Sequence, residues 1–344
     1  MLARVHVLLP YAFTIPEGEV YPIYQYELDG YVVLIYPPAR SEKADRHCEM
    51  EDVSVNGVKA LNADVLRIDF HKDSFDRTEG IDCDPPIDLI RRVANDFLSR
   101  LRYVTNASRV KLIEFPHTSW DVTYLNDDGS KIEVEKGTVG GRGARKFEFS
   151  FVALTKNVWN DIHSLEPHQP LPVWKNLLLD ADSVLPDVGP AVVLTFTALE
   201  VFISKLLDDL AMTGKVDKTL WNWINTRGYL KDPSIEERYD FLCRHLIGKS
   251  IKDNNELWEQ FKHLKLARNS FAHDGIAKIG TEVVTIERSR DFIRTANKII
   301  DFIKAEIPDD LLWPEFNHKI QLGFSKVIAI NDNDESKELK GPGS

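Results

Sequence analysis

The chain has 344 residues, of which 43% are hydrophobic and 28% are charged, and its formal net charge is −11 at pH 7. The length favours two domains, and the composition is ordinary for a soluble globular protein. The negative charge argues against a protein that coats nucleic acid through a broad basic surface, although it leaves room for a small local basic site.

The cysteines and the most apolar segments favour a cytoplasmic protein without a membrane span. Cys48, Cys83 and Cys243 are widely spaced and form no C-x-x-C pair, which favours reduced thiols. The N-terminal MLARVHVLLPYAF is interrupted by a proline and is typical of a strand rather than a signal peptide. The most apolar stretch, AVVLTFTALEVFISKLL, contains Glu200 and Lys205 and is short for a membrane span. IDCDPP around Cys83 imitates a metal site, but its spacing matches no zinc pattern, and we predict neither a metal nor another cofactor.

Short strands are predicted throughout the first half of the chain. The segments that favour them are rich in β-branched and aromatic residues: YVVLIYPP, DVLRIDFH, RVKLIEF, WDVTYL, KIEVE and FEFSFVAL. Asn56–Gly57 lies between apolar flanks and predicts a hairpin, and Asp127–Asp128–Gly129 predicts a second one.

One helix interrupts these strands. In PIDLIRRVANDFLSRLRYV the residues Ile90, Val93, Phe97 and Leu101 recur at three- and four-residue steps, which is the pattern of an amphipathic helix. We therefore predict that residues 1–155 form an α+β domain, with a mainly antiparallel sheet and one helix, that has a sensing or regulatory role.

Helical patterns dominate from about residue 156 onward and predict an all-α bundle over residues 156–330, with a boundary that can lie anywhere in NVWNDIHSLEPHQPLP. The predicted helices are LPVWKNLLLDADSVL, GPAVVLTFTALEVFISKLLDDLA, KTLWNWINTRG, SIEERYDFLCRHLIG, NNELWEQFKHLKLARNSFAH and RSRDFIRTANKIIDFIKAEI, with a short extended TEVVTIE before the last. Ser234 and Glu237 form a capping box, and Gly275 stops the fifth helix. Residues 331–344 are predicted to be a disordered tail that ends in GPGS, a typical cloning remnant.

The stretch RNSFAH brings Arg268, Asn269 and His273 together near a helix end. Asn269 and His273 are four residues apart and share a face, and we expect the long Arg268 side chain to swing over small Ala272. The helix dipole favours a protonated imidazole there, which suits proton transfer, while the guanidinium fork suits a phosphate. This strip therefore predicts RNA cleavage without a metal, in which His273 moves protons and Arg268 stabilises charge on the phosphate.

Other interpretations of these residues stay open. A cationic Arg and His near a helix C-terminus also stabilise the helix, and Asp274 can pair with either of them. Glu200 is either a rim residue of its helix or an acid that faces the same pocket, so Glu200 and Asp274 are candidate supporting residues.

The helical half resembles the HEPN superfamily of ribonucleases over roughly residues 170–306. The resemblance depends on the Arg-x4-His pattern of R-N-S-F-A-H on a late bundle helix, with Asn269 in the polar slot after Arg268, and on the Leu-Glu pair in TALEVFISKLL. It implies a homodimer in which two such helices face each other and build one composite site. It also implies metal-independent cleavage that leaves a 2′,3′-cyclic phosphate, and the layout is similar to that of abortive-infection proteins.

A Gly-rich basic loop precedes the last predicted strand of the first half. TVGGRGARKFEF lacks the ending of a P-loop, so it is either a flexible hairpin loop or a contact to the RNA backbone through Arg142, Arg145 and Lys146.

Three hypotheses follow from the sequence. The first is a dimeric endoribonuclease for phage defence or a toxin, with an RNA substrate and with a phage-derived activator or an antitoxin as a further partner. The second is a non-catalytic binding or scaffold module that holds a nucleotide or a protein partner in the same cleft. The third is a helical interaction protein in which RNSFAH is only a capped helix end.

Overall fold

The computed structural model divides the chain into two compact units, Met1–Leu171 with Phe316–Ser344 and Pro172–Glu315, called here the first unit and the helical unit. The residues described are 1–40, 48–75, 84–114, 118–132, 139–141, 151–225, 233–329 and 337–339. The helical unit is shorter at both ends than the predicted 156–330 domain. The reason is that the helix Lys156–Ser164 belongs to the first unit, and the chain returns to that unit from Phe316 onward.

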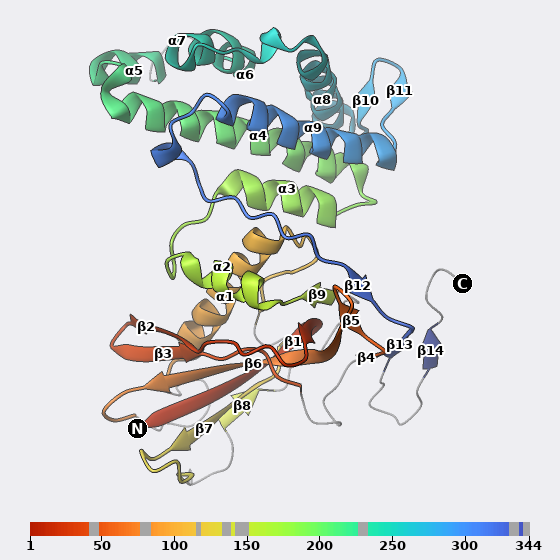
Figure 1. Ribbon diagram of the computed structural model, residues 1–344. Helices are drawn as coiled ribbons and strands as arrows, with labels where there is room; N and C mark the ends of the chain where they lie inside the picture. The colour runs from red at the N-terminus through yellow and green to blue at the C-terminus, as the bar shows by residue number, and fades with distance from the viewer. Residues whose placement is uncertain are drawn as a thin grey trace. The chain divides into compact units, whose positions relative to one another are not determined.

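In its described residues the first unit contains a large, mainly antiparallel sheet and two helices, which confirms the α+β prediction and adds one helix to it (Figure 1). The sheet strands are β1 (Leu2–Pro16), β2 (Tyr24–Leu28), β3 (Tyr31–Ile35), β5 (Ser54–Val55), β6 (Val58–His71), β7 (Trp120–Leu125), β8 (Val139–Gly141), β9 (Phe151–Ala153) and β12 (Leu322–Gly323). The helices are α1 (Ile87–Thr105) and α2 (Lys156–Ser164).

Strand β1 lies at the centre of this sheet, between β6 and β7, with β9 parallel to its far end. The register between β1 and β6 shifts between Leu8 and Phe13, around Pro10, which has no N–H to donate to a ladder. Asn56 and Gly57 both have positive φ and join Val55 to Val58, so the predicted hairpin is confirmed.

Helix α1 packs its apolar stripe on the sheet. The four residues predicted to face the core, Ile90, Val93, Phe97 and Leu101, are all fully buried. Phe97 makes an edge-on ring contact with Phe13 of β1, so the stripe meets the central strand.

The C-terminal segment adds strands to the first unit. Strand β12 pairs with β5, and β13 (Lys326–Ala329) pairs with β4 (Cys48–Glu51) and β14 (Lys337–Leu339). These pairings place strands inside the region predicted as bundle and tail, while most of 331–344 lies outside the described residues.

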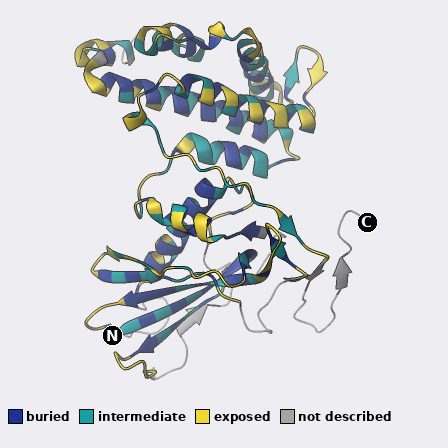
Figure 2. Ribbon diagram, in the orientation of Figure 1, coloured by how far each residue is buried: buried dark blue, intermediate teal, exposed yellow. Residues whose placement is uncertain are grey.

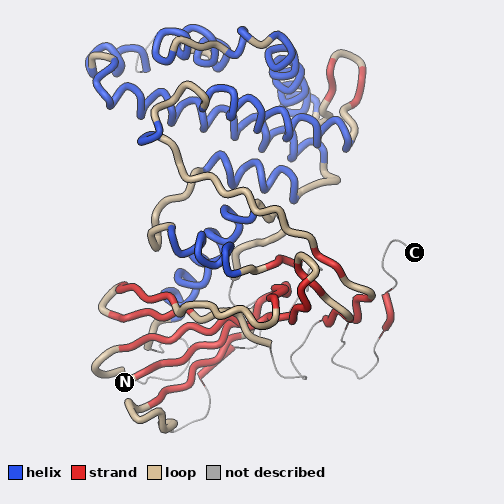
Figure 3. Tube along the Cα trace, in the orientation of Figure 1, coloured by secondary structure: helices blue, strands red, loops and turns tan. Residues whose placement is uncertain are grey.

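The helical unit confirms the predicted helical second part, with one small β-hairpin (Figure 3). Its α-helices are α3 (Val173–Ser183), α4 (Val188–Leu210), α5 (Lys218–Asn225), α6 (Ile235–Glu237), α7 (Cys243–Ile247), α8 (Asn255–Asp274) and α9 (Ile286–Lys304). Short π- and 3₁₀-helical turns join them at Ala211–Lys215, Arg238–Leu242, Ile251–Asp253 and Asp309–Leu311, and the hairpin is β10 (Lys278–Ile279) with β11 (Glu282–Val283). The capping box of Ser234 and Glu237 is confirmed.

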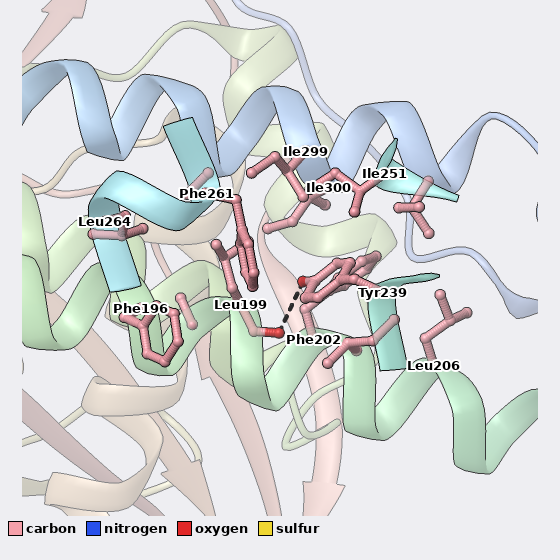
Figure 4. Packing of buried hydrophobic residues seen from close by; sticks show 14 of the residues in the cluster. Phe196, Leu199, Phe202, Leu206, Tyr239, Ile251, Phe261, Leu264, Ile299 and Ile300 are labelled. Atoms are coloured by element: carbon pink, nitrogen blue, oxygen red, sulfur yellow. Dashed lines mark hydrogen bonds between the residues drawn. The ribbon is translucent and has the colours of Figure 1, made fainter. Parts of the chain in front are cut away.

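Helix α4 is the central helix of this unit and contacts α3, α8 and α9. Its buried residues form one cluster with α8, α9 and Tyr239, whose hydroxyl donates to the carbonyl oxygen of Leu199 at 2.9 Å (Figure 4). By length and composition α4 is apolar enough to cross a membrane, but most of its apolar window is buried inside the unit, as in a soluble protein (Figure 2).

Candidate active site

The candidate site lies at the C-terminal end of α8. The Asn254 side chain caps the start of this helix by accepting from the Leu257 N–H at 3.1 Å. Gly275 ends it with φ 71°, a left-handed conformation that suits glycine, so the predicted stop is confirmed. Phe261, Leu264 and other apolar residues along one stripe of α8 face the core.

The end of α8 is held close to the start of α4. Gly189 allows this approach, because a Cβ atom at that position would lie only 2.0 Å from a ring carbon of Phe271. About two turns further along α4, Phe196 packs on Phe261, with 6.0 Å between the ring centroids. The two helices therefore fix where the RNSFAH segment lies in the unit.

Arg268 is half-buried against α4. Its guanidinium carbon lies 5.5 Å from the centre of the Phe196 ring, within the range of a cation–π contact. Its Nη1 donates to Oδ1 of Asn269 at 3.2 Å. Within the described part of the chain no carboxylate pairs with Arg268, so its charge stays available to an anion.

His273 lies in the last turn of α8 and is exposed. Five residues turn a helix by about 500°, so His273 and Arg268 leave the α8 axis about 140° apart. The guanidinium of Arg268 packs on Phe196, and among the described residues no hydrogen bond links it to His273. The structure joins Arg268 to Asn269 by a hydrogen bond, and His273 lies one turn beyond Asn269 on the same face of α8.

The two candidate supporting residues do not join this group. Among the described residues no hydrogen bond or ion pair links Glu200 to Arg268 or His273, and the carboxylate lies near Tyr239, where its charge helps to raise the pKa of that phenol, after burial and Cys243. Asp274 is exposed and accepts from the Ser270 hydroxyl at 3.5 Å, so its predicted pairing with Arg268 or His273 is not seen.

The loop residues predicted to contact RNA, Arg142, Arg145 and Lys146, lie outside the described residues. The same holds for Cys83 in the sequence that imitates a metal site. In the parts of the chain that the structure describes, no three His, Cys, Asp or Glu side chains gather as metal ligands.

Sequence patterns missed several residues that shape this region. Gly189 and Phe196 position the end of α8, and His263 and Arg288 contact each other on another side of it. One signal for Phe196 was present in the sequence: it lies four residues before the candidate Glu200, and this step places both residues on one side of α4. No local signal joins His263 to Arg288, which are brought together only by the packing of α8 on α9.

Comparisons with protein-family models, with curated proteins and with solved structures find no match to this chain.

Proposed function

We propose that the protein is a metal-independent endoribonuclease that acts as a homodimer, similar to HEPN ribonucleases. It works in the cytoplasm as a phage-defence or toxin-type effector. The first unit senses a trigger or restrains the nuclease. The observation that supports this most is that one helix end carries an exposed His273 and a half-buried Arg268 that has no acidic partner among the described residues.

The chemistry assigned to these residues is transfer of the RNA phosphodiester to the neighbouring 2′-oxygen. His273 from one chain takes the proton of the 2′-OH as it attacks phosphorus, and His273 from the partner gives a proton to the departing 5′-oxygen. Arg268 donates to the non-bridging oxygens, on which negative charge builds, and Asn269 holds the guanidinium through its 3.2 Å hydrogen bond. The products are a 2′,3′-cyclic phosphate and a 5′-hydroxyl.

The direction of the side chains is the argument for two copies. Within one helix Arg268 and His273 leave the axis about 140° apart, which makes it harder for both side chains of one chain to reach the same phosphate. Two α8 ends that face each other across a two-fold axis can place the arginine of one copy beside the histidine of the other. Two cations in one cleft also give a local positive potential in a chain whose net charge is −11.

The direct test is cleavage of single-stranded RNA in the presence of EDTA. We expect the Arg268→Ala and His273→Ala variants each to lose at least about 100-fold in rate, the scale of one lost proton-transfer or charge-stabilising group. Matched controls are His245→Ala, at another exposed histidine near a helix end, and Arg294→Ala, at an exposed arginine paired with Asp291. Equal cleavage by all five proteins would show that a contaminant cuts the RNA.

A mixture of inactive variants tests the composite site. A dimer of one Arg268→Ala chain with one His273→Ala chain keeps one arginine and one histidine on opposite chains. We expect the mixture to regain part of the cleavage that each variant lacks alone. No recovery in dimers verified by mass would contradict a site in which one arginine and one histidine from opposite chains suffice for cleavage.

The second candidate is a non-catalytic module that binds a nucleotide or scaffolds a protein partner through the same end of α8. The half-buried position of Arg268 on Phe196 favours it, because a guanidinium held by packing suits binding as well as catalysis. RNA binding that Arg268→Ala abolishes, without cleavage by the wild type, is the result expected of this module.

A further inference from the structure

A pocket of about 450 Å³ lies in the helical unit between α8, the β10–β11 hairpin and the start of α9. Such a volume is within the range of about 300–1,000 Å³ typical of small-molecule sites. The residues that matter to the argument line it: His263 from α8, Ile279, Glu282 and Val283 from the hairpin, and Arg288 from α9.

Arg288 gives one end of this pocket a positive charge. Its Nη2 donates to Oε1 of Gln260 at 2.7 Å, and its guanidinium carbon lies 4.9 Å from the centre of the Phe292 ring. These contacts hold the guanidinium in place without neutralising it. Over the described ranges no carboxylate lies within ion-pair distance of Arg288.

His263 lies beside this guanidinium, with its Nδ1 3.3 Å from Nη2 of Arg288. A neutral imidazole accepts at Nδ1 in this arrangement and carries its proton on Nε2. The same end of the pocket therefore offers the remaining guanidinium N–H groups and one imidazole N–H. Several donors around one cation suit an oxyanion, and the planar fork of arginine suits a phosphate in particular.

The hairpin residues that line the pocket have a different chemistry. Val283 is exposed, and Ile279 offers a second apolar side chain. Glu282 is exposed and acts as an acceptor only when ionised. An apolar wall with one carboxylate suits a flat ring that carries an amino group on its edge.

We propose that this pocket binds a single nucleotide, with its phosphate at Arg288 and His263 and an amino-bearing base at Glu282 and Val283. Guanine, adenine and cytosine present an amino donor to the carboxylate, whereas uracil flanks its one N–H with two carbonyl acceptors that a carboxylate repels. The pocket favours guanine most, because its Watson–Crick edge has two adjacent donors.

The nucleotide can be free or part of RNA. His263 precedes His273 by ten residues on α8, which is about 15 Å along the helix, so a strand that reaches His273 can extend to the pocket. In that case the pocket reads a base near the cleaved bond, and this version depends on the proposed ribonuclease function. The binding of a free nucleotide does not depend on it.

The test measures binding of 5′-GMP and 5′-UMP to the full chain by titration calorimetry. We expect GMP to bind at least about fivefold more tightly than UMP and to weaken at least about tenfold in Arg288→Gln, which lacks the charged fork. Val283→Trp should fill the pocket and have the same effect without disturbing the core, because Val283 is exposed. Glu282→Gln should remove the preference for GMP, and Arg290→Gln, an exposed arginine on the same helix, should bind as the wild type does.

A second arm uses a G-containing RNA oligonucleotide and the His273→Ala variant, which should bind without cutting. Binding of the oligonucleotide but not of GMP, lost in Arg288→Gln and Val283→Trp, would assign the nucleotide to the RNA substrate. If neither ligand responds to these two substitutions, the pocket proposal is overturned even where RNA cleavage is intact. Arg288-dependent binding of GMP in a protein that never cuts RNA would instead overturn the ribonuclease and keep the pocket.

Discussion

Arginine and histidine lie near each other in both units, and the two regions use them differently. In the first unit, Arg100 is 1% exposed and forms an ion pair with Asp96 at 2.7 Å, while its Nη1 donates to the carbonyl oxygens of Ile162 and Leu165. In the helical unit, Arg268 is half-buried and His273 is exposed, and neither pairs with an acid among the described residues.

The surroundings of the histidines show the same contrast. His163 stacks on Tyr24 with 3.8 Å between ring centroids and makes an edge-on contact with Trp159. Burial and, to a smaller extent, the charge of Arg100 lower the pKa of His163 to about 3, so this imidazole behaves as an aromatic core residue. The residue types are therefore the same in the two regions, which differ in exposure and in the presence of an acidic partner.

The largest expected effect is on the buried arginine. Arg100→Ala leaves Asp96 buried without its cation, so we expect the free energy of unfolding to fall by about 3–5 kcal/mol. Arg91→Ala on the same helix breaks an exposed pair with Asp88 and should cost less than about 1 kcal/mol. Urea denaturation measures both, and a loss for Arg268→Ala as large as that for Arg100→Ala would remove the contrast between the two regions.

The close contact below the candidate site gives the next effect. Gly189→Ala places a methyl group into the Phe271 ring, so we expect a loss of about 1–3 kcal/mol and a slower RNA cleavage as the end of α8 shifts. Gly189→Ala combined with Phe271→Leu should recover part of the lost stability and part of the lost cleavage rate, because the smaller leucine side chain makes room for the methyl group. Gly248→Ala is the control, because Gly248 ends α7 and not α8. Its φ of 75° disfavours alanine, so this variant should lower stability without a specific loss of cleavage.

Local patterns predicted most of the secondary structure for physical reasons that are visible in single residues. The stripe from Ile90 to Leu101 repeats at helical spacing and is buried, and Gly275 ends α8 as expected. Hairpin β10–β11 was only half predicted, as the extended TEVVTIE, because its partner strand Lys278–Ile279 is two residues long. The division between the units, Leu171 to Pro172, lies within NVWNDIHSLEPHQPLP, where the sequence left it open, but later than the 155/156 bound, since α2 has a helical sequence whichever unit it packs on.

The candidate site was predictable in its members and not in its geometry. Arg268, Asn269 and His273 are adjacent in sequence, so their types and their helix could be read directly. The position of the Arg268 guanidinium depends on Phe196, which lies 72 residues away and has no pattern that links it to Arg268. The buried ion pair of the first unit had a local signal in the four-residue step from Asp96 to Arg100, but spacing alone does not show burial.

Acidification distinguishes the buried histidine from the exposed one. Below pH 6.5 the unfolded chain binds a proton at His163, and the folded chain does not until the pH approaches 3, so the free energy of unfolding falls as the pH falls through this window. At pH 5 this contribution amounts to about 2 kcal/mol. His163→Phe should flatten the decline in stability between pH 6.5 and 5, as followed by urea denaturation.

The groups around His163 titrate or carry charge in the wild type and in His163→Phe alike. The difference between the two stability profiles therefore isolates the contribution of the imidazole. They are Tyr24 and Tyr26 of β2, Asp96 and Arg100 of α1, and His168 after α2. His245→Phe, a substitution of an exposed imidazole, should leave the pH profile unchanged. Parallel profiles for wild type and His163→Phe would mean that the buried ring accepts protons as readily as a free one.

The smallest effect is expected for His273→Ala. The imidazole is exposed in the last turn of α8, where its charge interacts with the helix dipole alone, so the free energy of unfolding should change by less than about 1 kcal/mol in either direction. Because the effect on stability is this small, a loss of RNA cleavage in His273→Ala reports on chemistry and not on unfolding. A helix-end role without chemistry predicts the reverse: a measurable loss of stability on melting, and the same RNA cleavage, or none, in wild type and variant.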